Sequence, residues 1–64
     1  MRETEFWRRI ESHLGHPYAR VWAEQMVLAD LGGRTVVDAL EAGVDARTVW
    51  RAVWSVLDLP DSER

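Results

Sequence analysis

Residues 34–54, RTVVDALEAGVDARTVWRAVW, decide the fold of this 64-residue chain. They consist of a short stretch with helical spacing, a Gly-Val turn and a longer amphipathic stretch. Thr35, followed three residues later by Asp38, resembles a capping box with a shortened acid, which predicts a helix over residues 36–42. Gly43 ends that helix, because glycine accepts the left-handed backbone with which many helices close.

The stretch after the turn predicts a strongly amphipathic helix. Asp45 is placed to cap it, and Pro60 limits it to residues 46–58, because proline is not tolerated in a helix interior. Val44 is placed to fold back against the preceding helix. The apolar side chains of this helix span an arc of roughly 160°, at 100° per residue. They are Ala46, Val49, Trp50, Val53, Trp54, Val56 and Leu57. This face is expected to pack against the core.

Two further helices are predicted upstream. Residues 5–14 carry one apolar stripe at intervals of four, and Gly15 is a natural helix stop. Residues 17–31 have apolar or small side chains around most of the circumference, which is typical of a central helix that is contacted on several sides. Gly32 and Gly33 break this helix.

These elements predict an all-α fold, a compact bundle of three main helices plus one short helix, with a helix-turn-helix-like C-terminal half. The chain is expected to form a single small domain over residues 1–64, with a frayed polar tail at residues 61–64. It contains no cysteine, so the apolar 47% of its residues must stabilise the fold without disulfides.

The charge balance restricts the partners. Formal net charge is −3, from eleven acidic and eight basic residues, all eight of which are arginine. The chain therefore has no overall positive field that would attract it to nucleic acid or to an anionic membrane. No apolar run of about 20 residues could span a bilayer, and nothing near Met1 resembles a secretory signal. We expect a cytoplasmic protein with no membrane partner.

The spacing of several small and apolar residues resembles the helix-turn-helix of bacterial repressors. They are Ala39, Gly43 with Val44, Val49 and Ala52. In such a protein, Arg47 and Arg51 would contact bases or phosphates. Trp50 and Trp54 count against this interpretation, since they share the apolar face, and so does Asp38, which stands where repressors usually have an apolar residue. Together with the acidic net charge, these observations make nucleic acid a disfavoured alternative partner.

Four tryptophans are the outlier in the composition. Large aromatic rings bury much apolar area, so a small domain without cysteines can use them for its core alone. Alternatively, two of them lie at the edge of the core beside arginines, because Trp and Arg are enriched among the anchors of protein interfaces. We predict a non-enzymatic interaction or regulatory domain with an unknown protein partner. Its candidate partner surface comprises Arg34, Arg47, Trp50, Arg51 and Trp54. A homodimer formed through the Trp edge is a further alternative.

Signals for catalysis and for metal binding are weak. His13 and His16 are three residues apart, but Gly15 and Pro17 separate them onto different elements, so no metal or cofactor is predicted. No serine sits in a glycine-rich elbow beside a base, and we assign no catalytic residue. The stretch Gly32-Gly33-Arg34-Thr35 fits either an anion-binding nest or, as we favour, a simple turn before a helix.

The whole chain resembles the short actinobacterial proteins grouped as domain of unknown function 3046. The resemblance rests on Met1-Arg2, Thr4-Glu5-Phe6, Gly15 with Tyr18-Ala19, Val27-Leu28, Gly33-Arg34-Thr35, Ala39-Leu40, Gly43-Val44, Arg47, Val49-Trp50-Arg51-Ala52, and Asp58 with Pro60. Trp7, Trp22 and Trp54 are not part of this pattern. The resemblance implies a small cytoplasmic helical protein of an actinobacterium and implies no activity, because the family's function is unassigned.

Overall fold

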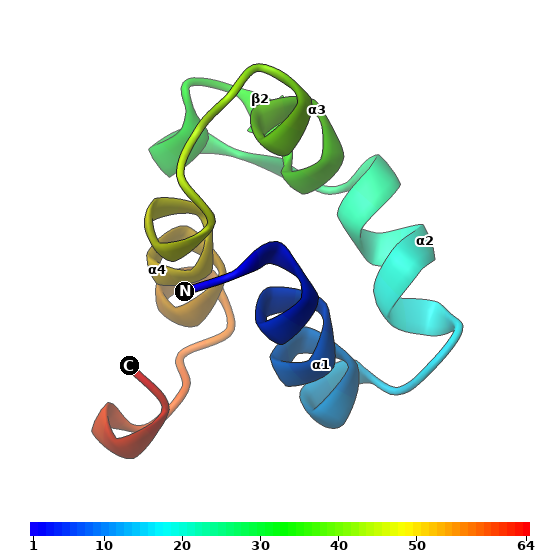
Figure 1. Cartoon of the computed structure of the whole chain (residues 1–64), viewed down its shortest axis with the longest axis vertical. Helices are drawn as coiled ribbons and strands as arrows, with labels where there is room; N and C mark the ends of the chain where they lie inside the picture. The colour runs from blue at the N-terminus through cyan, green and yellow to red at the C-terminus, as the bar shows by residue number, and fades with distance from the viewer.

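A computed structural model describes residues 1–64 and shows a mostly helical chain with four α-helices and one small antiparallel sheet of two strands. In Figure 1, α1 lies between α4 on the left and α2 on the right, and α3 lies with the sheet at the top. In chain order the elements are α1 (Glu3–Leu14), α2 (Tyr18–Gln25), β1 (Val27–Leu28), η1 (Ala29–Leu31), β2 (Arg34–Thr35), α3 (Val36–Glu41), α4 (Ala46–Val56) and η2 (Asp61–Glu63). The expected helical character is confirmed at this level, whereas the sheet was not expected.

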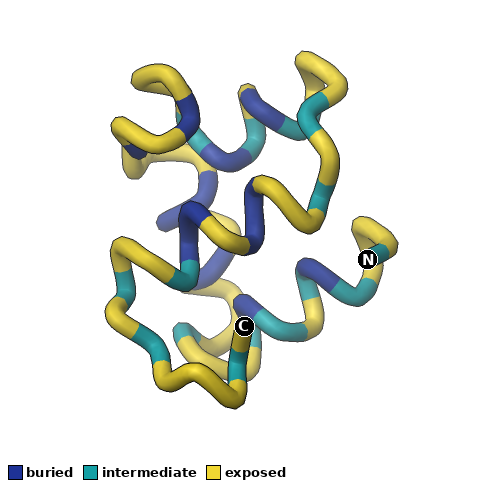
Figure 2. Tube along the Cα trace, turned by 90° about the vertical axis from the view of Figure 1, so that its left-hand side faces the viewer, coloured by how far each residue is buried: buried dark blue, intermediate teal, exposed yellow.

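One hydrophobic core joins these elements. Helix α1 packs against α2 and α4, and α3 packs against the same two helices. Figure 2 shows the buried positions on the inward side of each helix. None of the 13 buried residues is polar or charged. They are Phe6, Ile10, Ala19, Trp22, Ala23, Leu28, Leu31, Val36, Ala39, Val49, Trp50, Ala52 and Val53.

The turn between α3 and α4 has the geometry that its sequence predicts. The Thr35 hydroxyl accepts a hydrogen bond from the backbone N–H of Asp38 at 3.1 Å, which caps α3. Gly43 has a φ of 91°, and its N–H donates to the Leu40 carbonyl at 3.1 Å, while the N–H of Val44 donates to the Ala39 carbonyl at 3.0 Å. This pair of bonds is a Schellman motif, and it satisfies two carbonyls at the helix end.

The cap predicted for α4 is absent. Asp45 precedes the helix, but its side chain makes no capping hydrogen bond.

The helix predicted over residues 17–31 is wrong beyond Gln25. At Met26 the backbone turns extended, with ψ of 120°, and β1 then pairs with β2 in the register Val27 with Thr35 and Leu28 with Arg34. Met26 and Val27 remain 43% and 58% exposed. The apolar character all round this segment therefore reflects a helix followed by a strand, each with its own buried face, rather than one central helix.

The predicted frayed tail is also wrong. Residues 59–64, which we call the C-terminal strap, turn back over α4 and include η2. The indole N–H of Trp50 donates to the Glu63 carbonyl at 2.8 Å, and that of Trp54 donates to the Pro60 carbonyl at 2.9 Å. The Glu63 carboxylate also pairs with His13 of α1 at 2.8 Å. The strap thus holds its place through two indole donors and one side-chain hydrogen bond, despite its polar sequence.

The connection from α4 into the strap contains the one non-glycine residue with positive φ, Asp58 at 55°. Its N–H donates to the Ser55 carbonyl at 3.2 Å, and the N–H of Leu59 donates to the Trp54 carbonyl at 3.1 Å, so Asp58 occupies the position that glycine occupies in the α3 motif.

We therefore expect Asp58→Gly to be more stable than Asp58→Ala by about 1 kcal/mol, because only glycine accepts this backbone without strain. Urea denaturation of the two variants measures the difference. Equal midpoints, or a more stable alanine variant, would contradict the left-handed assignment.

Candidate interaction surface

Trp50 is 0% exposed and contributes no area to a partner surface. Its ring meets Phe6 edge-on, with ring centroids 6.0 Å apart and an interplanar angle of 83°. The His13 ring stacks beside the Trp50 ring, with ring centroids 6.1 Å apart. The indole N–H of Trp50 donates to the Glu63 carbonyl. Trp50 is therefore a core residue, and its inclusion in the predicted partner surface is corrected.

Trp54 is half-buried beneath the C-terminal strap. Its N–H is bonded to the Pro60 carbonyl, and the guanidinium carbon of Arg64 lies 4.9 Å from the centre of its ring. A cation over an indole face is attracted by the electrons of the ring. Only part of Trp54 is accessible to a partner, and that part is bordered by arginine.

Arg47 and Arg51 lie one turn apart on α4, and both are exposed. No carboxylate lies within ion-pairing distance of either guanidinium, since the ion pairs of the structure involve only Arg9, His13 and His16. Arg34 is exposed on β2, which Figure 1 places beside α3, and it lines no pocket with the arginines of α4. The predicted surface is thus brought together only in part.

Two further arginines, which the sequence did not single out, lie near Arg47 and Arg51 in the structure. Arg9 of α1 and Arg64 of the strap line a recess of about 320 Å³ together with Arg47. The remaining residues that line it are Met1, Glu5 and Ser62. A second recess of about 190 Å³, lined by Arg51, Trp54, Ser55 and Arg64, adjoins the first through Arg64. We call Arg9, Arg47, Arg51 and Arg64 the arginine face. No spacing in the sequence signals it, because folding alone brings its first and last members together.

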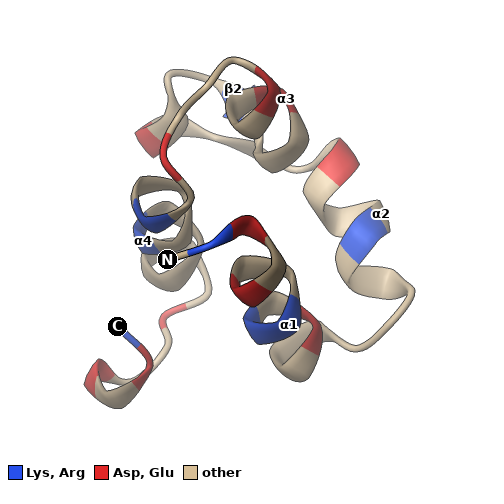
Figure 3. Ribbon diagram, in the orientation of Figure 1, with Lys and Arg blue, Asp and Glu red and all other residues tan.

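The arginine face is positive although the chain is acidic overall. Figure 3 shows basic positions on α1, α4 and the C-terminus, acidic positions beside them on α1 and in the strap, and further acidic positions on α3 and in the turn before α4. The positive character is therefore confined to the side chains that line the two recesses. Among the side chains that line the first recess, Glu5 is the one carboxylate, and it pairs with Arg9 at 3.1 Å. Arg47 lies in the first turn of α4, where the partial positive charge of the helix end makes a cation unfavourable. Helix stability therefore does not explain the presence of Arg47.

The histidines and the glycine pair are occupied by local structure. His16 faces Glu11 at 3.3 Å, whereas His13 faces Glu63, and no group of three His, Asp or Glu side chains is arranged to hold a metal ion. Gly32 and Gly33 both have positive φ, and their N–H groups donate to the carbonyls of Ala29 and Leu28. These N–H groups are thus used within the turn, which supports the turn interpretation of this stretch over an anion nest.

The exposed apolar area lies mainly on α2 and just beyond it. Tyr18, Val21 and Met26 are 56%, 43% and 43% exposed and line a shallow groove with Trp22 and Gln25. A homodimer through the predicted Trp edge would have to use Trp54 alone, because Trp50 is buried.

The fold and this surface define a small, mostly helical protein with a localised basic face, none of whose helices has the length and apolarity to cross a bilayer. The family described as "Protein of unknown function (DUF3046)" matches residues 1–62, and the chain belongs to this family. The resemblance inferred from the sequence is thereby confirmed. No curated protein and no solved structure matches the chain.

Proposed function

We propose that this protein is a non-enzymatic interaction domain that binds an acidic segment of a partner protein on the arginine face. The observation that carries the proposal is the convergence of four arginines from α1, α4 and the strap around two adjoining recesses. Only Arg9 among them has a carboxylate partner. Arginine forks bind carboxylates in a planar, bidentate geometry, and unpaired arginines beside a tryptophan edge are typical of interface anchors. The cytoplasmic location and the actinobacterial origin expected from the sequence stay predictions.

The geometry suits an extended acidic segment that reaches both recesses. The two recesses share Arg64, so a chain that fills both would place at least two negative charges against the face. The part-exposed Trp54 between Arg51 and Arg64 offers an apolar contact to the same segment.

DNA binding through α4 is the second candidate, because the exposed side of this helix is polar. Arg47, Thr48, Arg51 and Ser55 are all exposed there, and the burial of Trp50 removes one objection to a helix-turn-helix. Ala39, Val49 and Ala52 are buried, as that motif requires.

The acidic residues around the turn count against DNA. Asp38, Glu41 and Asp45 are exposed on α3 and immediately before α4. In a helix-turn-helix complex, the beginning of the second helix approaches the DNA, so Asp45 would face phosphates. With a net charge of −3, we rank the acidic protein segment above DNA.

Fluorescence anisotropy with a labelled oligo-glutamate peptide and a labelled mixed-sequence duplex tests the proposal. We expect the peptide to bind and Arg47→Gln/Arg51→Gln to weaken its binding by about tenfold or more, since charged hydrogen bonds contribute about 1.5–3 kcal/mol each. Arg8→Gln/Arg34→Gln is the matched control, because it removes the same charge from exposed residues away from the face.

Three results decide between the candidates. Equal weakening by both double variants would indicate general charge attraction and contradict the proposal, as would the absence of peptide binding. Tighter binding of the duplex than of the peptide, with a steep loss on raising salt, would favour the DNA candidate.

A further inference from the structure

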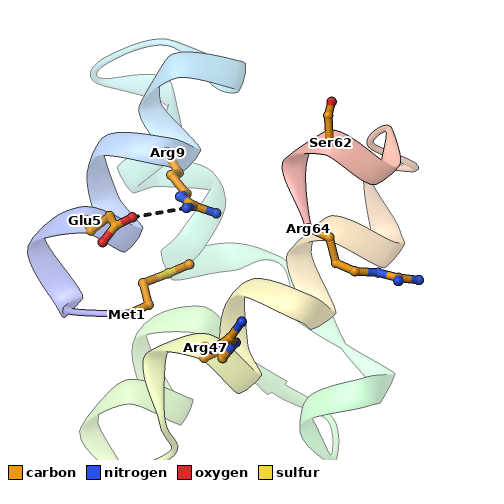
Figure 4. Close-up of a pocket in the computed structure, with 6 residues that line it drawn as sticks. All are labelled: Met1, Glu5, Arg9, Arg47, Ser62 and Arg64. Carbon is orange, nitrogen blue, oxygen red and sulfur yellow. Dashed lines mark hydrogen bonds and ion pairs between the residues drawn. The ribbon is translucent and has the colours of Figure 1, made fainter.

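The first recess of the arginine face has two cationic groups aimed into it. Figure 4 shows Arg9 from α1 and Arg47 from α4 reaching into the space between these helices, with the Met1 side chain between them. Arg64 borders the same recess, but its guanidinium is turned aside and lies over Trp54. Ser62 of the strap borders the recess, with its hydroxyl directed away from Arg9 and Arg47 in Figure 4. The recess therefore combines fork-shaped donors from two helices.

We infer that this recess binds a phosphoryl group. Two guanidinium groups from different helices can each donate two hydrogen bonds, and a phosphate dianion offers more acceptor oxygens and a larger negative charge to them than a carboxylate does. Arg47 has no acidic partner and stands in the first turn of α4, where a bound anion would interact favourably with both its charge and the helix end. The inference rests on the proposed function, because it names the chemical group that the same face recognises.

The strap fixes the third side of the recess before any ligand binds. Ser62 lies between the two backbone carbonyls that the indoles hold, those of Pro60 and Glu63. The hydrogen bond between His13 and the Glu63 carboxylate ties the same segment to α1. Because these contacts order the strap in advance, a ligand would not have to pay the entropy of ordering it.

Substitution of Glu5 tests the inference, because the inference predicts the direction in which phosphate affinity changes. Its carboxylate shares the recess and holds Arg9 through one oxygen, from Oε2 to the Arg9 Nη2 at 3.1 Å. A phosphoryl group must compete with this carboxylate for Arg9 and is repelled by its charge. Glu5→Gln should therefore strengthen phosphate binding by about threefold, the effect expected of one partly exposed charge.

The experiment follows backbone amide NMR shifts of the full chain during titration with inorganic phosphate at constant ionic strength, with chloride as the reference anion. We expect saturable shifts around residues 5–9, 47 and 62–64. Arg47→Gln should weaken binding by about tenfold, while Arg34→Gln, on β2, should leave it unchanged. Thermal unfolding confirms that each variant is folded. The inference is overturned if phosphate shifts no amides around the recess, or if Glu5→Gln weakens binding.

A second titration separates the sources of the phosphoryl group and the two proposals. A phosphoserine peptide that binds more tightly than free phosphate, and more tightly than the same peptide with aspartate, would identify a phosphorylated partner. Free phosphate binding as tightly as the peptide would identify a small phosphate ester instead. If oligo-glutamate binds and no phosphate compound does, the phosphoryl site is wrong while the proposed function stands. If no anion binds, both are wrong.

Discussion

Trp50→Ala is expected to lower the free energy of unfolding by about 3–5 kcal/mol, the range for removing a fully buried large aromatic side chain. Trp50 is the largest side chain with no exposed area, and it contacts α1 through Phe6 and the strap through Glu63. Its removal leaves a cavity between these elements and also leaves the Glu63 carbonyl without its donor. Both effects act in the same direction.

The size of the chain makes this loss severe. A domain of this length has a total stability of roughly 3–10 kcal/mol, at 0.05–0.15 kcal/mol per residue. The variant should therefore unfold at much lower urea concentration or be largely unfolded without urea. Far-UV circular dichroism during urea titration measures this.

The matched control is Trp54→Ala on the same helix. Trp54 is half-buried, donates to one carbonyl of the strap and is covered by Arg64, so its loss should cost less, about 1–2 kcal/mol. If Trp50→Ala leaves the denaturation midpoint unchanged, Trp50 is not in the core and returns to the candidate partner surface.

Local signals predicted the half of the fold that contains α3 and α4. Thr35 and Gly43 each act on backbone groups within a few residues of themselves, as a cap and as a left-handed helix stop. Such interactions depend little on the rest of the chain, which is why the sequence predicts them well. The amphipathic face of α4 was predicted for the same reason, because its period is a property of the helix alone.

The sheet and the strap could not be predicted in this way. Val27 and Leu28 form strand hydrogen bonds with Thr35 and Arg34 instead of continuing the helix. The helical pattern of the sequence does not mark the residue at which strand pairing becomes more favourable than helix. The strap binds to indole N–H groups through backbone carbonyls, which every residue possesses. Its sequence therefore carries no specific signal for this contact.

The sequence pointed to two of the four residues of the arginine face. Arg47 and Arg51 share one exposed side of α4, which helical spacing reveals. Arg9 and Arg64 reach the same surface from opposite ends of the chain, once α1 packs on α4 and the strap turns back. Trp50 was placed on the candidate surface because it stands beside Arg47 and Arg51 in the sequence, but the core and the strap cover its ring and its N–H.

Phe6→Ala is expected to cost a similar amount, about 3–5 kcal/mol, because Phe6 joins α1 to the rest of the core. It is 0% exposed and meets two tryptophans edge-on, Trp7 at 5.4 Å and Trp50 at 6.0 Å. Without this ring, α1 loses an aromatic contact with α4, and the packing beneath the recess between Arg9 and Arg47 is weakened. Urea denaturation measures the loss of stability.

Two substitutions show which property of Phe6 matters. Phe6→Leu keeps most of the buried apolar volume and gives up the edge-on aromatic contacts, so it should cost only about 0.5–1.5 kcal/mol. Trp7→Ala removes the larger neighbouring ring, which is only half-buried and has Arg20 3.9 Å from its centre on the exposed side. It should cost clearly less than Phe6→Ala, because solvent already reaches that ring. A larger loss for Trp7→Ala than for Phe6→Ala would mean that α1 presents a different face to α4, and that Arg9 does not line the recess.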